Sequence, residues 1–210
     1  MRSAPMRILL AGLAGLAGAG ALAACLAFVA ATAPPPVRAV AQLDLQRYAG
    51  TWYEIARLPN RGQARCAADA TTMVWPVDER SLKLVRECRD GADRPVFTVG
   101  EAVADPADRS GARFSLTHRP SLPGWWPRAS ESHWVVLLDD EYRYAVVSDP
   151  ARRSLWILSR TPRLAPDTYA SIVGELRERR YPVDRLVPTP HRAWHPAGLL
   201  PVGRRTRLIV

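Results

Sequence analysis

Histidine and cysteine are the residue types in this 210-residue sequence that most often serve metal binding, proton transfer or covalent chemistry. Two of the four histidines, His191 and His195, are four residues apart, but Pro196 follows them directly. No zinc-protease spacing, Gly-x-Ser-x-Gly elbow or phosphate-binding loop is present. Three cysteines cannot supply a four-cysteine zinc site within one chain. We therefore expect a protein that is not an enzyme and that uses no metal or cofactor.

Cys66 and Cys88 are spaced as a disulfide pair would be. Their midpoint is Val77, in a turn between two segments with the composition of strands. If these segments pair as a hairpin, the two cysteines face each other at its far end, where opposed Cα atoms are about 4.5 Å apart. Two independent buried thiols are the alternative.

The N-terminal segment has the pattern of an export signal. Arg2 and Arg7 precede an uncharged stretch of 26 residues, 8–33. Within this stretch, the letters LAAC ending at Cys25 resemble the lipobox of bacterial lipoproteins, where the chain is cut before the cysteine and lipid is attached to the thiol. Cys25 is therefore the predicted lipidation site, and an outer-membrane lipoprotein is the expected form.

Two other interpretations of this segment remain open. The small-x-small triplet at 39–41 offers a cleavage site before Gln42, which would release a periplasmic protein. Alternatively, the uncharged stretch is long enough to span a bilayer as an uncleaved anchor. Every interpretation places the rest of the chain in the cell envelope, outside the cytoplasm, where two thiols can be oxidised.

The formal net charge of +9 first suggests nucleic acid or an anionic membrane as partner. Lys83 is the only lysine, so nearly all of the positive charge is arginine. For an exported chain we expect no nucleic-acid partner. The surplus arginine then points to lipid phosphates at a membrane surface, and the oligomeric state is left open.

Short strand-like segments separated by turns make up most of the remaining sequence. Stretches that alternate apolar and polar residues, such as SLKLV at 81–85, are typical of half-buried strands. The expected strands are 51–58, 68–75, 81–88, 95–104, 111–118, 132–138, 142–148 and 154–160. Eight antiparallel strands can close into an up-and-down barrel that holds one small ligand, and a two-sheet sandwich is the alternative.

One amphipathic helix is expected after the strands, between residues 166 and 180. Its apolar stripe follows helical spacing and consists of Tyr169, Ile172, Val173 and Leu176. Packed on the barrel wall, this helix would cover strand residues such as WVVLL at 134–138, which are apolar on both faces. The predicted fold class is therefore all-β, an eight-stranded antiparallel barrel with a C-terminal helix on its wall.

Three domains or segments follow from this layout. Residues 1–41 form the export or anchor segment with a Pro-rich spacer, residues 42–188 form the folded domain, and residues 189–210 form a C-terminal tail.

Three motifs together resemble the lipocalin family. GTWYEIAR at 50–57 is similar to the G-x-W signature of the family, LDDEYRYA at 138–145 to its second motif and LWILSRTP at 155–162 to its third. They occur in family order, and the fuller wording resembles bacterial outer-membrane lipocalins and their apolipoprotein D-like relatives. The resemblance covers roughly residues 43–188. The structural residues that it implies are Gly50, Trp52, Asp139, Tyr142 and Arg160.

The resemblance also implies roles for particular residues. Trp52 would plug the closed end of the barrel, and Arg160 would pack across its ring; neither residue would be catalytic. The loops 59–67 and 119–130 would lie at the open mouth. Trp125 and Trp126 in the second loop are candidates for contact with a lipid tail or a membrane, or they simply pack the loop down.

Alternation along the strands suggests which residues line the interior. If Trp52 faces inward, Glu54, Ala56 and Leu58 share its face. An inward Glu54 would need a partner such as an arginine or a ligand head group. In the sixth expected strand one face carries Trp134, Val136 and Leu138. These residues are the candidate ligand-binding set, together with the two tryptophans of the mouth loop.

By resemblance, we expect a lipocalin of the bacterial cell envelope that binds and carries a fatty acid or a lysophospholipid for membrane maintenance or stress response. The alternative is a surface-docking module with a filled barrel that binds anionic lipid or polysaccharide. A lipid-modifying enzyme is the third hypothesis.

Overall fold

The computed structural model describes residues 34–118 and 130–192 of the chain. The predicted residues Cys25, Trp125 and Trp126 lie outside these ranges. The elements are α2 Leu45–Tyr48, β1 Gly50–Arg57, η1 Arg61–Gln63, β2 Ala68–Pro76, β3 Ser81–Arg89, β4 Pro95–Ala104, β5 Arg113–His118, β6 Ser130–Leu138, β7 Tyr144–Ser148, β8 Leu155–Ser159, α3 Pro166–Glu178, η2 Val183–Arg185 and β9 Val187–Pro188. Within the described ranges, no helix is long and apolar enough to cross a membrane.

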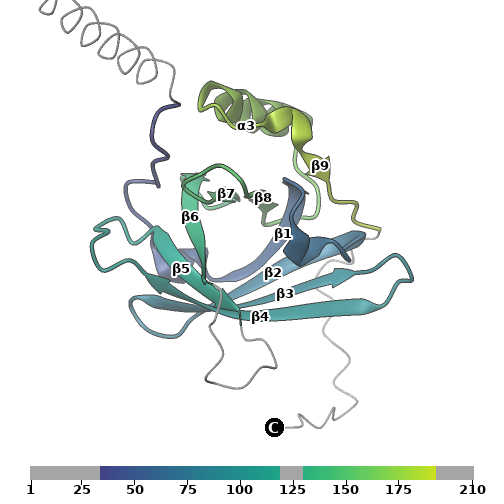
Figure 1. The fold of residues 1–210 in the computed structure, drawn as a ribbon, viewed down its shortest axis with the longest axis horizontal. Coiled ribbons are helices and arrows are strands. Elements are labelled where there is room, and N and C mark those ends of the chain that lie inside the picture. The colour runs from purple at the N-terminus through teal and green to yellow at the C-terminus, as the bar shows by residue number, and fades with distance from the viewer. Residues whose placement is uncertain (1–33, 119–129, 193–210) are drawn as a thin grey trace, which may run out of the picture. The chain divides into compact units, whose positions relative to one another are not determined.

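Strands β1 to β8 form a closed antiparallel barrel (Figure 1). Consecutive strands pair from β2 to β8, and β1 pairs with both β2 and β8, which closes the sheet. The first half of β1 lies against β2, and its second half lies against β8. Beyond the end of the β2 pairing, β9 takes the place beside Ala56 and Arg57. The barrel prediction is confirmed, and the sandwich alternative is excluded.

Helix α3 packs on the outer wall of the barrel beside β7 and β8 (Figure 1). Ile172 and Leu176 of its apolar stripe are buried against wall residues that include Val146 and Ile157. Every residue of β8 is therefore buried, although the strand lies at the surface of the barrel. Pro166 occupies the first turn of the helix, where its missing N–H costs no hydrogen bond. The predicted wall helix is confirmed.

A second core fills one end of the barrel interior. The residues almost completely buried in it are Trp52, Phe114, Leu116 and Val135. Tyr48 of α2, just before β1, packs in the same core. This is the end where β1 begins. The open space for a ligand must therefore lie toward the end where β1 finishes.

Two β-bulges change which face of a strand points into the barrel. The pairing of β1 with β8 shifts register between Glu54 and Ala56, and the pairing of β6 with β7 shifts between Val135 and Leu137. One extra residue in a strand reverses the inward and outward alternation beyond it. Simple alternation therefore fails across both positions.

The folded domain extends beyond residues 42–188 at both ends. Val37 is buried in the core under α3, and the N–H of Val40 donates to the carbonyl of Val135 at 2.9 Å. After β9, the N–H of Thr189 donates to the carbonyl of Ile55 at 2.9 Å. Residues 37–40 and 189–192, predicted to be spacer and tail, are thus part of the packed structure.

Candidate functional site

The closed end of the barrel is held by Trp52 and Arg160. The guanidinium carbon of Arg160 lies 3.7 Å from the centroid of the Trp52 ring, and the indole N–H donates to the carbonyl of Tyr48 at 2.8 Å. Arg160 also donates to the carbonyls of Arg47 at 2.6 Å, Thr51 at 3.1 Å and Tyr142 at 3.3 Å. These contacts use three of the five N–H donors of Arg160 and hold the guanidinium at the closed end of the barrel, which fits the structural role expected for it.

The neighbouring motif residues also have structural partners. Gly50 has a φ of 96°, and a Cβ there would lie 3.4 Å from a terminal nitrogen of Arg160. The hydroxyl of Tyr142 accepts from the N–H of Asp44 at 2.9 Å. The side chain of Arg143 donates to both carboxylate oxygens of Asp139 at 2.9 Å, which lowers the pKa of that carboxyl below its ordinary value. The second motif thus forms a tight turn next to the plug.

A cavity of about 590 Å³ lies at the other end of the barrel. Its described wall comes from the loop at 60–66, from β2 to β6, from the β7–β8 connection and from Trp156 of β8. Most of these side chains are polar or charged, while Val96, Pro150, Trp156 and the disulfide supply apolar surface. The cavity is therefore suited to an amphiphile rather than to a purely apolar molecule.

The bulges correct the predicted lining. Ala56, Leu58 and Val136 are buried in the core under α3, and Trp134 packs against that core. Leu138 packs against the closed-end core instead. None of these five side chains lines the cavity described above. The bulge in β1 turns Ala56 and Leu58 outward. Trp134 precedes the bulge in β6 and already lies on the outer face of the barrel.

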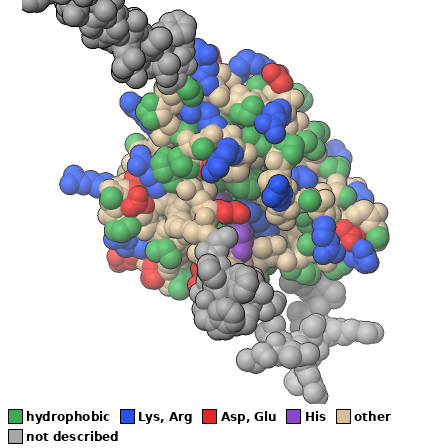
Figure 2. All heavy atoms as spheres, in the orientation of Figure 1, with side chains coloured by type: hydrophobic (Ala, Val, Ile, Leu, Met, Phe, Trp, Pro, Cys, Tyr) green, Lys and Arg blue, Asp and Glu red, His purple; other side chains and the backbone are tan. Residues whose placement is uncertain are grey.

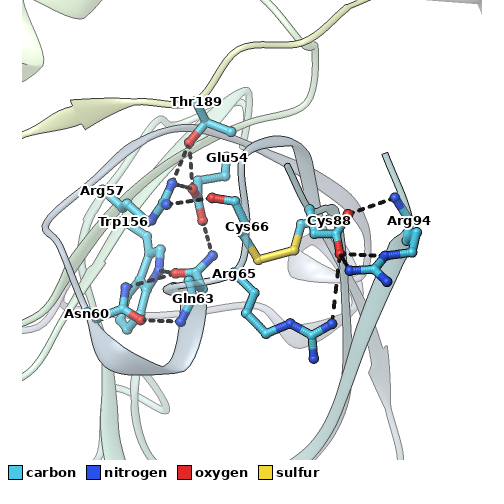
Figure 3. The surroundings of a disulfide bond; sticks show 11 residues. Glu54, Arg57, Asn60, Gln63, Arg65, Cys66, Cys88, Arg94, Trp156 and Thr189 are labelled. Carbon is cyan, nitrogen blue, oxygen red and sulfur yellow. Dashed lines mark hydrogen bonds and ion pairs between the residues drawn. A yellow bond between two sulfur atoms is a disulfide. The ribbon is translucent and has the colours of Figure 1, made fainter. Parts of the chain in front are cut away.

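Glu54 is buried, but its partners come from the protein (Figure 3). One carboxylate oxygen accepts from Arg57 at 2.9 Å and from the hydroxyl of Thr189 at 2.5 Å, and the other accepts from the amide of Gln63 at 2.6 Å. Gln63 in turn accepts from the indole N–H of Trp156 at 2.6 Å. Glu54 thus fixes the mouth loop and orients Trp156, rather than contacting the cavity itself.

The predicted disulfide between Cys66 and Cys88 is confirmed, with Cα atoms 5.5 Å apart (Figure 3). Its geometry differs from the expected one. Val74 lies opposite Leu84, so the β2–β3 hairpin is centred two residues later than Val77. Cys66 therefore precedes β2 instead of pairing within it, and the bond ties the mouth loop to β3.

Arg86 of β3 lines the inner part of the cavity. Its guanidinium carbon lies 4.8 Å from the centroid of the Trp156 ring. Within the described part of the chain it has no ion pair or hydrogen bond through its side chain. Loss of hydration lowers the pKa of this guanidinium, and the Glu54 carboxylate opposes that effect. Arginine keeps its charge in proteins, so a cation lies at the base of the cavity.

Below Arg86 lies a second, smaller cavity of about 10 Å³, which has room for about one water molecule. It is lined by His133, which is 3% exposed and has no hydrogen-bond partner on either ring nitrogen among the described residues. Burial lowers the pKa of His133 from 6.5 to about 3, and the charge of Arg86 contributes. His133 is therefore neutral at physiological pH.

Arg86, His133 and Trp156 were not among the predicted site residues, but the sequence carries a signal for one of them. Leu82 and Leu84 are buried, and alternation places Arg86 on the same face of β3. A charged residue on the apolar face of a strand is a candidate for ligand contact.

The surface carries no equivalent concentration of charge on the face in view. Figure 2 shows arginine and lysine side chains spread over this face rather than gathered in one patch.

Within residues 34–118 and 130–192, no group of three or more His, Cys, Asp or Glu side chains is placed to hold a metal ion.

Comparison with known proteins identifies the family of this chain. A family model described as a lipocalin-like domain matches residues 43–191. Temperature-induced lipocalin-1 of Arabidopsis thaliana is 30% identical over 149 residues, covering 70% of this chain and 79% of the plant protein. The outer membrane lipoprotein Blc of Escherichia coli K12 is 30% identical over 162 residues, covering 76% of this chain and 87% of Blc.

Solved structures support the fold independently. Insecticyanin from the tobacco hornworm Manduca sexta superposes with a TM-score of 0.60 at 18% identity, covering 79% of this chain and 88% of insecticyanin. At this identity the likeness concerns the barrel alone.

Proposed function

Since the chain belongs to the lipocalin family, we propose that it binds a single-chain lipid, a fatty acid or a lysophospholipid, and carries it within the bacterial cell envelope. Lipocalins bind small hydrophobic molecules in their barrels, and the chain shares this architecture. The observation that carries the proposal is the cavity of about 590 Å³ at the open end. This volume lies within the range of roughly 300–1,000 Å³ that is typical of small-molecule sites.

The lining of the cavity supports an amphiphilic ligand. An acyl chain would gain about 25 cal/mol for each Å² of apolar surface that it buries, before the cost of association. Val96, Pro150 and Trp156 offer such surface, while polar side chains surround it. The alternative of a docking module with a filled barrel is less well supported, because the described residues fill one end of the barrel and leave a cavity at the other. We propose binding and transport without catalysis.

The envelope location rests on two observations. Blc of several bacteria is named an outer membrane lipoprotein, and the lipobox-like sequence ends at Cys25. In addition, Val37 and Val40 pack on the barrel, so cleavage before Gln42 would remove contacts of the folded domain. We therefore propose lipidation at Cys25, or retention as an anchor, in preference to release at residue 42. The role would be membrane maintenance or stress response.

Two measurements test the proposal on the full chain, produced with its own leader and delipidated on a hydrophobic resin. Hexadecanoic acid and a lysophospholipid should each bind saturably and quench tryptophan fluorescence, because Trp156 lines the cavity. Mass spectrometry should find lipid on Cys25. Absence of saturable binding for every single-chain lipid would contradict the proposed function.

A further inference from the structure

We propose that the cavity takes a fatty acid with its carboxylate inward, bound by Arg86 at the base, and not with its head group at the mouth. This inference rests on the proposed function and specifies both the ligand class and its direction.

Arg86 is a cation in the cavity wall without a counter-charge of its own among the described residues. It lines both cavities, and its guanidinium lies over the ring of Trp156 at 4.8 Å. The ring holds the guanidinium in place without neutralising it, so its N–H donors stay available. No carboxylate among the described residues lies within ion-pair distance of Arg86. Arg86 is half-buried, and a partly desolvated cation without an acidic partner is costly, so a bound anion lowers that cost.

Glu54 and Glu131 are the two acids whose charges act on Arg86, and both face other partners. Glu54 is held by Arg57 at 2.9 Å, by Gln63 and by Thr189. Glu131 is about half exposed and faces His118 at 3.4 Å. The positive charge at the base therefore remains available for a ligand.

The small cavity supplies a second, independent observation. His133 is almost fully buried and both of its ring nitrogens lack a partner among the described residues, yet it lines this space together with Arg86. Buried polar groups in folded proteins are nearly always hydrogen-bonded to protein, water or ligand. One water in the small cavity can accept from or donate to His133 and donate to a carboxylate on Arg86. The base of the barrel thus carries polar groups for a terminal anion.

The size of the small cavity selects the head group. Beyond Arg86 there are only about 10 Å³, so nothing large can follow the anionic group of the ligand. A fatty acid carboxylate is a terminal group with no atoms beyond it, and its two oxygens match the paired N–H donors of the guanidinium. A lysophospholipid with ethanolamine or choline beyond its phosphate does not fit this direction. We therefore commit to a fatty acid carboxylate, with a terminal phosphate monoester as the competing source.

The first test compares ligands on the full chain without mutation. Hexadecanoic acid should bind about 10-fold to 100-fold more tightly than hexadecanol, because a hydrogen-bonded charge is lost in the alcohol. Equal affinity would overturn the inward site but leave the proposed function standing. If a monoacyl phosphate monoester binds more tightly than the acid, the carboxylate assignment is wrong. If no lipid binds, the proposed function fails and this inference with it.

The second test uses variants of the same strand. Arg86→Gln should remove the preference for acid over alcohol, and Arg86→Lys should keep part of it. Arg89→Gln, also on β3 but outside the cavity, should leave both affinities unchanged. Thermal unfolding of each variant checks that it is folded. An unaltered preference in folded Arg86→Gln would overturn the inference, whatever the binding strength.

Direction can be measured separately with hexadecanoic acid brominated at C2 or at C16. Bromine next to the carboxylate should quench Trp156 more strongly than bromine at the tail end. Comparison with Trp156→Phe isolates that signal from the other tryptophans. Stronger quenching of Trp156 by the C16 label would place the head group at the mouth and contradict the proposal.

Discussion

Replacing Arg160 by glutamine should destabilise the barrel without weakening lipid binding. The change removes a guanidinium 3.7 Å from the Trp52 centroid and three hydrogen bonds to carbonyls. A partly exposed cation–π contact contributes about 1 kcal/mol, and each part-buried hydrogen bond from a charged donor about 1.5 kcal/mol. The bond to Arg47 is exposed, so water replaces it.

Water reaches the carbonyls that Arg160 vacates and offsets part of these contributions. The free energy of unfolding should therefore fall by about 3 kcal/mol. In a chain of this length the thermal midpoint should fall by about 6–12 °C. Differential scanning calorimetry on the full chain measures it. Arg163→Gln is the matched control, since Arg163 is exposed and is not part of the plug.

Two results would refute the reasoning. A midpoint for Arg160→Gln equal to that of Arg163→Gln would show that the plug contacts contribute nothing. A large loss of fatty acid affinity in a folded Arg160→Gln would show that the closed end belongs to the binding site.

Three further predictions concern stability. Reducing the bond between Cys66 and Cys88 should cost about 3 kcal/mol, measured by urea unfolding with and without reductant. Gly50→Ala should cost about 2 kcal/mol by the same assay, because its φ of 96° strains any side chain. The native pKa of His133 is lowered to about 3, so the unfolded state binds more protons below pH 6.5 and stability falls as pH drops toward 3. His133→Gln should flatten that slope between pH 6.5 and 5; an unchanged slope would contradict the burial of a neutral histidine.

The barrel and its wall helix could be predicted from the sequence, because the periodicity of apolar residues follows directly from which side chains are buried. The alternation at 81–85 and the stripe at Ile172 and Leu176 were each confirmed, as was the bond between Cys66 and Cys88. The motif residues Trp52 and Arg160 also lie together as expected.

The lining of the site was harder to predict for a physical reason. A bulge depends on how two distant strands pair. The local sequence of β1 therefore does not predict the extra residue between Glu54 and Ala56. A buried carboxylate such as Glu54 is likewise ambiguous until the fold reveals whether Arg57 or a ligand is its partner. Arg86 could have been predicted as an inward-facing residue, because alternation alone places it on the same face of β3 as Leu82 and Leu84.

The double pairing of β1 has a consequence for the order in which the chain folds. β1 is among the first strands made, but its second half pairs with β8 and with Val187 and Pro188 of β9, more than 90 residues later. Contacts between such distant segments form slowly because a long loop must close first. A chain exported as proposed above would therefore stay unfolded until its C-terminal strands have crossed the membrane, and the mouth of its barrel would be completed last.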